Sequence, residues 1–409
     1  MRPWQLSLSG HAPHLSSRAV FKTYGSSMLR KFRGALFAFA LFAASGDAQS
    51  AVDAHVVRPQ LETYAQIAYR AYAGAYEYAR VLQRAVDQFV AEPGDDANEQ
   101  LEILRQAWLD AHASYGLTEV FRFYEGPIDF GKRPDGSQGP ELLLNAWPLN
   151  EAYIEEFIAN DVPITRELLI DRNARDDEAD VTTGYHAIEY LLWGPDRNAH
   201  GPGQRSPRDF LGDGAASRRR QYLKVATDLL VEHLAAVVAA WSPGAPNYRE
   251  SFLRLHPSDS LANVLTGLAT LSGFELGFER LATALDSGSQ EDEQSCFSDS
   301  TIADVVANVT GVADVYFGRF GDFQGAGLDS LLATEHPAIN ELLRRQIAQS
   351  QALAQALDRP FDRTLSTPPG SSERAKVEAL ITSLQTQTRL FQQAGAALGV
   401  SIVVDTEYE

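Results

Sequence analysis

The sequence predicts an all-α protein built from helical bundles. Apolar residues recur at helical spacing over long stretches, and segments rich in Gly and Pro separate these stretches. No stretch alternates apolar and polar residues for long enough to predict a sheet. The chain has 409 residues, of which 44% are hydrophobic, so it is long enough to form two cores. We therefore expect two helical lobes at residues 51–210 and 211–400 and a tail at 401–409.

The N-terminal region resembles a signal peptide for export at residues 28–50. A basic stretch that begins at Met28 is followed by an apolar run at 35–44 and by small residues at 46–48. The apolar run is too short to span a bilayer, so no membrane-spanning segment is expected in the mature chain. Residues 1–27 would be an extension, and we expect translation to start at Met28. These features predict a protein of the bacterial periplasm or cell envelope.

The charge of the chain excludes some classes of function. Its formal net charge is −19 and its pI is about 4.9, and no dense Lys/Arg run with interleaved aromatic residues follows the first fifty residues. Binding to nucleic acid is therefore not expected. The single cysteine, Cys296, excludes an internal disulfide and any Cys-rich zinc or iron–sulfur site. An acidic exported chain is suited to handling cations.

Helices are expected in series along the whole chain. Each has an apolar face at helical period, and several have a start or stop signal such as Asn98 or Pro360. Of the loops between them, 126–141 is unusually long and is a candidate functional loop, while 194–214 marks the expected lobe boundary. The expected helices are 56–90, 98–120, 151–159, 165–170, 184–193, 218–241, 257–286, 300–317, 336–357 and 372–398.

The helix at 184–193 carries the candidate site. One of two preceding threonines is expected to cap its N-terminus, and Gly194 ends it. His186 and Glu189 are three positions apart, so they share one face of the helix. The helix dipole disfavours a charged imidazole in the first turn. A neutral imidazole beside a carboxylate is a candidate metal-ligand pair.

If only these two residues are considered, a hydrogen bond between His and Glu inside a helical bundle is a commoner explanation of the pair than a metal site. An ordinary zinc peptidase helix is excluded, because position 190 is Tyr where a second His would be needed. Helical bundles do bind iron through His and Glu at this spacing, with help from further carboxylates. The candidate carboxylates are Glu119, Asp129, Glu141, Glu275, Glu279, Asp299 and Asp304.

Two other motifs have a local interpretation beside a functional one. Arg122 lies one helical turn from Glu119, which most often makes a surface ion pair. The segment from Ser298 to Thr301 is typical of a helix N-cap.

With these residues in place, the sequence resembles the imelysin family of exported bacterial proteins, which carry a Gly-x-His-x-x-Glu motif. Here the motif is Gly184, His186 and Glu189. Further matching segments occur in order: residues 121–129, 139–150, 184–194, 273–280, 295–299 and 360–362. The resemblance implies two helical lobes that resemble each other, a cleft between the lobes that the motif faces, and a link to iron supply. A local likeness between residues 183–189 and 272–279 agrees with an internal duplication.

The chain departs from the family pattern around residues 295–304. The family tends to have His where this chain has Gln294 and Ile302, and Asn where it has Ser300. If those histidines contribute to a metal or substrate site, this chain lacks their contribution.

The leading hypothesis is a binding protein that holds a divalent or ferric metal ion, iron or zinc, or a metal-bearing ligand, in the cleft. The metal ligands would be His186, Glu189 and Glu119, and other envelope components of iron uptake are candidate partners. The further ligand-binding candidates are Arg122, Asp299, Ser298, Gly184 and Glu275. The rival hypothesis is a metal-dependent peptidase in which Glu189 or Glu119 polarises a water molecule. A third is a structural or adhesive envelope protein in which the pair is only a hydrogen bond.

Overall fold

The computed structural model describes residues 54–91, 94, 96–129, 139–198, 200–402 and 404. The predicted signal peptide and the extension before it lie outside the described residues. So do residues 130–138 of the predicted functional loop and most of the predicted tail.

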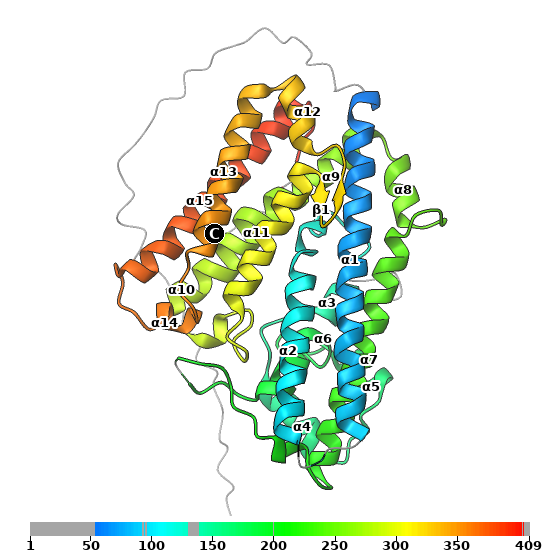
Figure 1. Cartoon of the computed structure of the whole chain (residues 1–409), viewed down its shortest axis with the longest axis vertical. Helices are drawn as coiled ribbons and strands as arrows, with labels where there is room; N and C mark the ends of the chain where they lie inside the picture. Colours follow the sequence, from blue (N-terminus) through cyan, green and yellow to red (C-terminus); the bar gives the residue numbers. More distant parts are fainter. Residues whose placement is uncertain are drawn as a thin grey trace, which may run out of the picture. The chain divides into compact units, whose positions relative to one another are not determined.

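The first group of helices is organised around α1 (Ala54–Ala91), which packs along its length on α2 (Ala97–Gly116) and α7 (Ala215–Trp241). Figure 1 shows these three long helices running alongside one another. Shorter elements connect them, and α6 packs on both α2 and α7. The connecting elements are η1 (Glu119–Phe121), α3 (Pro140–Leu144), α4 (Glu151–Ala159), α5 (Arg166–Arg172), α6 (Gly184–Trp193) and η2 (Pro207–Phe210).

The second group consists of α9 (Pro257–Ala269), η3 (Thr270–Ala282), α11 (Thr301–Phe317), α13 (Pro337–Gln355) and α15 (Ser372–Ala397). Helix α15 packs on η3 and α13, and α11 packs on α13 and also on α2 of the first group (Figure 1). The smaller elements are α8 (Tyr248–Arg254), α10 (Thr283–Ser287), η4 (Gln290–Asp292), α12 (Leu328–Glu335), α14 (Phe361–Leu365) and two short strands, β1 (Arg319–Phe320) and β2 (Phe323–Gln324).

The all-α prediction is confirmed. In the described part of the chain the strands are limited to the two-residue antiparallel pair β1–β2. The expected helix at 257–286 is α9, η3 and α10 in succession, and α12 is a separate helix that was not predicted and that precedes the one expected at 336–357. The division into two duplicated lobes stays a prediction.

A larger and a smaller apolar core hold these helices together. The larger core runs from Val57 on α1 through the α7 side chains to Phe391 on α15, so it crosses the predicted boundary at residue 210. Helix α7 lies after that boundary, yet it packs on α1 and α6. The smaller core lies among η3, α10, α11, α14 and α15, and includes Leu276 and Ile302.

The segment η3 is a π-helix that continues α9. A π-helix bonds residue i to residue i+5, and such segments occur frequently at functional sites. Together α9, η3 and α10 span Pro257–Ser287, which is long and apolar enough to cross a membrane by length and composition alone. Of its most apolar window, 67% is buried inside the protein, as in a core helix.

Candidate functional site around His186

Helix α6 lies in the interior, between two glycines that both have positive φ. All ten of its residues are buried. Gly184 begins the helix with φ +85°, and a Cβ at this position would lie 2.5 Å from the carbonyl oxygen of Leu144. Only glycine tolerates both the positive φ and this close approach. Gly194 ends the helix with φ +72°, as expected from the sequence, whereas the hydroxyl of Thr183 donates to Leu143 and does not cap the helix.

His186 and Glu189 form a hydrogen-bonded pair in the interior. Nδ1 of His186 lies 2.8 Å from Oε2 of Glu189, and the two side chains are 1% and 0% exposed. The other carboxylate oxygen, Oε1, accepts hydrogen bonds from both the backbone N–H and the hydroxyl of Ser298, at 2.9 and 2.6 Å. Because a carboxylate can only accept, Nδ1 of His186 carries the proton. Nε2 then has a free lone pair, and it has no hydrogen-bond partner among the described residues.

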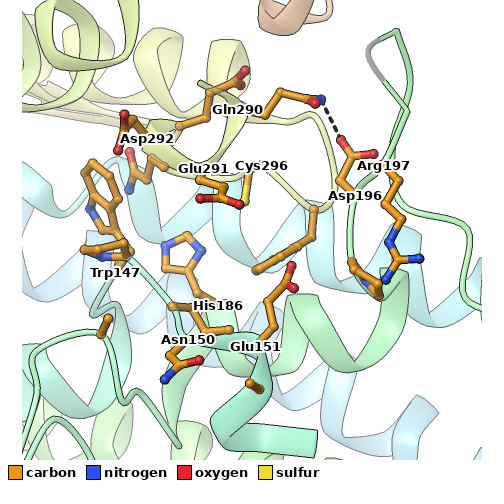
Figure 2. Close-up of a pocket in the computed structure, with 18 residues that line it drawn as sticks. Trp147, Asn150, Glu151, His186, Asp196, Arg197, Gln290, Glu291, Asp292 and Cys296 are labelled. Atoms are coloured by element: carbon orange, nitrogen blue, oxygen red, sulfur yellow. Dashed lines mark hydrogen bonds between the residues drawn. The ribbon is translucent and has the colours of Figure 1, made fainter. Parts of the chain in front are cut away.

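His186 lies in the wall of a pocket of about 570 Å³. Figure 2 shows its imidazole facing the segment that carries Gln290, Glu291 and Cys296. Among the residues that the structure describes, five carboxylate residues line this pocket against a single guanidinium, that of Arg197. The pocket is therefore electronegative, which favours a cationic ligand. The five carboxylate residues are Glu151, Asp196, Glu291, Asp292 and Glu293.

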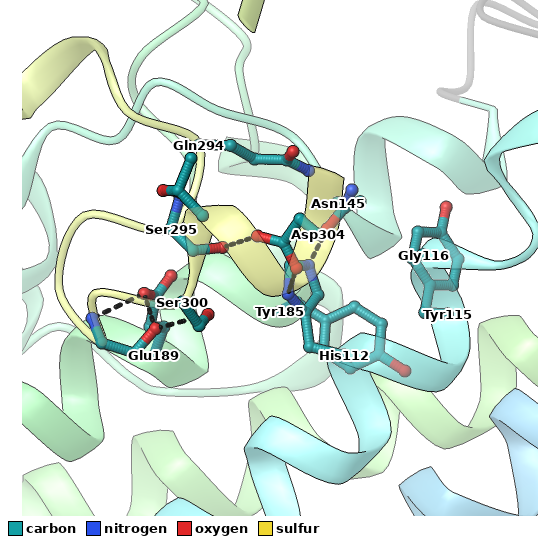
Figure 3. Close-up of polar contacts among 12 residues, drawn as sticks. His112, Tyr115, Gly116, Asn145, Tyr185, Glu189, Gln294, Ser295, Ser300 and Asp304 are labelled. Carbon is teal, nitrogen blue, oxygen red and sulfur yellow. Dashed lines mark hydrogen bonds and ion pairs between the residues drawn. The ribbon is translucent and has the colours of Figure 1, made fainter. Parts of the chain in front are cut away.

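A second histidine, His112 on α2, packs against the ring of His186 with centroids 5.2 Å apart. Its Nδ1 lies 3.0 Å from Asp304 and its Nε2 lies 3.0 Å from the side-chain oxygen of Asn145. Ser295 donates to the other oxygen of Asp304 at 2.6 Å (Figure 3). Burial, the largest single effect, favours the neutral form of His112, but the charge and hydrogen bond of Asp304, together with Glu189 and Asn145, outweigh it and raise the pKa of His112.

His112 was not among the site residues predicted from the sequence. The available signal was a histidine on the apolar face of a helix, one turn after Trp108, on which its ring stacks. That signal alone is more typical of a core residue, and the pairing with Asp304 depends on α11 packing against α2.

Glu119 lies in a separate network of ion pairs. Its Oε2 accepts from Arg122 at 2.7 Å and from Arg280 at 2.6 Å. Burial alone would raise the pKa of Glu119, but the two guanidinium groups lower it to about 2. Arg280 also donates to Gln294 and Asn308, at 2.8 and 3.0 Å. Gln294 lines the His186 pocket, so it connects this network to the pocket wall.

Glu141 and Glu275 complete the same network. Arg122 lies 3.2 Å from Glu141, and Arg280 donates to Glu275 at 2.7 Å. Glu275 and Arg280 are five residues apart, which in an α-helix would turn them about 140° away from each other. The π-helical turn of η3 brings them onto one face. Burial raises the pKa of Glu141 to about 7, because the attraction of Arg122 is offset by the like charges of Glu119 and Glu275.

Asp299 lies in a third group, with Asp196 and Asp362. Its backbone has φ +56°, a left-handed conformation that is uncommon outside glycine. Burial, followed by the charges of Asp362, Asp196 and Glu189, raises the pKa of Asp299 to about 8. Burial and the neighbouring Asp362 raise the pKa of Glu293 to about 10.

The structure thus separates the predicted site residues into three groups. Gly184, His186, Glu189 and Ser298 lie together; Glu119, Arg122, Glu141 and Glu275 lie together; and Asp299 lies with two aspartates that were not predicted as ligands. Of the remaining candidate carboxylates, Asp304 pairs with His112, Asp129 accepts from the backbone of Tyr124 and Gly126, and Glu279 lies on η3.

Two of the three positions that we expected to differ from the family pattern, Gln294 and Ile302, have a clear structural setting. The side-chain oxygen of Gln294 accepts a hydrogen bond from the guanidinium of Arg280. Ile302 is 1% exposed and packs in the smaller apolar core. Residue 302 therefore makes an apolar core contact.

Comparisons with known proteins agree with this architecture. The chain matches the family model described as imelysin over residues 65–391. It is 25% identical over 340 residues to iron-regulated protein A of Synechococcus elongatus, a match that covers 81% of this chain and 83% of that protein.

Two solved structures share the fold. One is assigned as a precursor of iron-regulated protein A from Parabacteroides distasonis, with a TM-score of 0.67 and 18% identity over 85% of this chain and 98% of its own. The other is an imelysin-like protein from Psychrobacter arcticum, with a TM-score of 0.60 and 16% identity over 86% of this chain and 98% of its own.

Proposed function

The chain belongs to the imelysin family, as its motifs predict, and we propose that it is an exported envelope protein that binds a metal ion or metal-bearing ligand beside His186. The link to iron supply rests on the resemblance to iron-regulated protein A, a name that belongs to the relative. The export and the periplasmic location rest on the signal-peptide pattern at residues 28–50.

The observation that carries this proposal is the free Nε2 of His186. It is buried, it lacks a hydrogen-bond partner in the described part of the chain, and its ring lies in the wall of an electronegative pocket. The pairing of Nδ1 with a carboxylate is the arrangement that usually orients a metal-binding histidine and raises its basicity. Glu189 would then orient the ligand from behind, and His186 would supply the donor atom.

The same geometry supports a bound chelate over a bare ion. Glu189 already receives three hydrogen bonds, and Glu119 is held by two guanidinium groups in a different network. Neither is placed beside Nε2 as a second donor. A bare transition metal ion needs about four protein ligands in a closed site, whereas a chelated metal needs only an open coordination position.

The peptidase hypothesis is less well supported by these contacts. A general base must reach the water that it activates. Glu189 is fully buried and its oxygens are occupied, and the low pKa of Glu119 makes it a weak base. Binding is therefore the function that the site supports best.

Isothermal titration calorimetry on the mature protein tests the proposal. The probes are Zn²⁺, Fe²⁺ under anaerobic conditions, and ferric citrate. We expect one of these to bind to the wild type and the His186→Ala variant to lose at least about tenfold in affinity, because it removes the donor nitrogen.

The matched control is His256→Ala, which removes an exposed histidine ahead of α9. It should bind as the wild type does. Equal affinity in the wild type and the His186→Ala variant for all three probes, or no binding by the wild type, would overturn the proposal. Circular dichroism of both variants shows whether the fold is retained.

A further inference from the structure

Three aspartates from distant parts of the sequence meet at one point beside the His186 pocket. Asp196 comes after α6, Asp299 precedes α11, and Asp362 lies on α14. One oxygen of each lies within 4.8 Å of the others. From this arrangement we infer that the three aspartates form a second site, independent of His186, that binds a hard divalent cation of the Ca²⁺ type.

Carboxylate oxygens in this group lack donors among the described residues. Both oxygens of Asp299 are buried without a hydrogen-bond partner, and so is Oδ1 of Asp362, whose side chain is only 2% exposed. Burying an ionised carboxylate without a positively charged or hydrogen-bonding partner is strongly unfavourable. Unpaired carboxylate oxygens that converge in this way are suited to coordinating a cation.

The group also lacks a basic partner among the residues that the structure describes. Within that part of the chain, none of the three aspartates has an ion pair with Lys, Arg or His. The main shared donor is the side-chain amide of Gln290, which contacts Asp196 at 3.0 Å and Asp362 at 2.6 Å. One neutral amide therefore bridges two carboxylates at the place where a cation would bridge them.

One further carboxyl group, that of Glu293, lies beside the three aspartates. Glu293 is 1% exposed, and burial together with the adjacent carboxyl group of Asp362 raises its pKa to about 10, so it is protonated and adds no negative charge to the group. The Gln290 amide can also turn its oxygen inward, since the two ends of an amide differ little in shape. It would then serve as a fourth oxygen ligand.

The donor set indicates the class of ion. It consists of carboxylate and amide oxygens, and no thiol or imidazole of the described residues belongs to it. Oxygen ligands of this kind suit Ca²⁺, Mg²⁺ and Mn²⁺, whereas iron(II) and zinc favour sites with nitrogen or sulfur. The three aspartates come from three separate segments of the chain, so the coordination geometry of the site is adaptable. This favours Ca²⁺ over Mg²⁺, which demands a nearly ideal octahedron.

The competing explanation is that the carboxyl groups are protonated and share protons instead of a cation. The two explanations predict opposite results for a variant that removes one charge. Without a cation, Asp299→Asn relieves repulsion whatever the buffer contains. With a cation site, the same change abolishes the stabilisation that the cation provides.

The experiment uses the mature protein after treatment with a chelator. Calorimetric titration and thermal unfolding are measured with Ca²⁺, and with Mg²⁺ as the competitor, on the wild type and on Asp299→Asn. We expect one Ca²⁺ per chain and a higher melting temperature of the wild type in Ca²⁺. For Asp299→Asn we expect at least about tenfold weaker binding and no Ca²⁺-dependent rise.

Three further variants make the result specific. Asp196→Asn changes a half-buried aspartate of the group and should also weaken Ca²⁺ binding. It replaces Asp299→Asn in the experiment if that variant fails to fold. Asp314→Asn removes an aspartate of α11 that pairs with Arg319, outside the group, and should bind Ca²⁺ normally. His186→Ala should also bind Ca²⁺ normally, which separates this site from the one in the proposed function.

The inference is overturned if the chelator-treated wild type binds no Ca²⁺, or if Asp299→Asn and Asp196→Asn bind it as tightly as the wild type. Loss of Ca²⁺ binding in His186→Ala would overturn the independence of the two sites. None of these results depends on whether Zn²⁺, Fe²⁺ or ferric citrate binds.

Discussion

Ser298 holds the carboxylate of Glu189 through two hydrogen bonds to a single oxygen, from a position 109 residues further along the chain. The other oxygen of Glu189 holds His186. Ser298 therefore links the segment before α11 to the orientation of an imidazole on α6. It is part of the site although it does not line the pocket.

Replacing Ser298 by Ala should weaken ligand binding at His186 without abolishing it. The backbone N–H still reaches Glu189, but the shorter of the two bonds is lost, so the imidazole is less firmly oriented. Partners of this kind typically contribute about 10- to 100-fold in metal affinity, and we expect the lower end of that range. The affinity is measured by calorimetry with whichever of the three probes the wild type binds.

The control for this change is Ser350→Ala. Ser350 is also a buried serine in a hydroxyl network, but it pairs with Ser383 between α13 and α15. Its loss should leave the affinity unchanged. An unchanged affinity in Ser298→Ala as well would show that Ser298 does not support the site.

Replacing Gly184 by Ala should destabilise the protein more than replacing Gly212 by Ala. Both glycines have φ near +85°, at +85° and +86°, so both changes introduce the same backbone strain of about 1 to 2 kcal/mol. Only at Gly184 does the new Cβ also meet backbone atoms, those of Leu144, while no described atom lies within 4 Å at Gly212. Overpacking adds about 1 to 3 kcal/mol.

The difference is measured as the free energy of unfolding in urea for the two variants. Equal losses at the two positions would contradict the close approach of α6 to α3. Because α6 also carries His186, we expect Gly184→Ala to weaken ligand binding and Gly212→Ala to leave it intact.

The pH dependence of stability should contain a contribution from Glu141. Its pKa is raised from 4.5 to about 7 in the folded protein, so the folded state binds its proton more tightly than the unfolded state does. The contribution of Glu141 to the free energy of unfolding is therefore fully present below about pH 4.5 and is lost as the pH rises through 7. The loss is on the order of 1 to 3 kcal/mol between pH 5 and pH 8.

The Glu141→Gln variant cannot ionise and should lack this part of the pH dependence. The free energy of unfolding is compared at pH 5 and pH 8 for the wild type, Glu141→Gln and the control Glu250→Gln, whose carboxylate is exposed on α8. A difference between the two pH values that is as large in Glu141→Gln as in the wild type would show that Glu141 is ionised at both.

Much of the helical architecture can be predicted from local pattern. The apolar period of residues 56–90 predicts α1, and the Gly194 stop signal predicts the end of α6. The spacing of His186 and Glu189 likewise predicts that they share a face, since three residues cover nearly one helical turn. The π-helical turn of η3 was not predicted from the local pattern, and the helix that packs on it, α15, is distant in the sequence.

The sequence by itself determined the all-α fold and the family, which depend on local patterns repeated along the chain, and the pairing of His186 with Glu189, which lie within one turn of a helix. The tertiary structure decided which polar atoms are satisfied. Arg280 reaches Glu119 from 161 residues away, and Ser298 reaches Glu189 from 109 residues away. Such contacts depend on how helices pack. Only the folded chain therefore shows that Nε2 of His186 has no hydrogen-bond partner among the described residues, whereas Glu119 is ion-paired with two arginines.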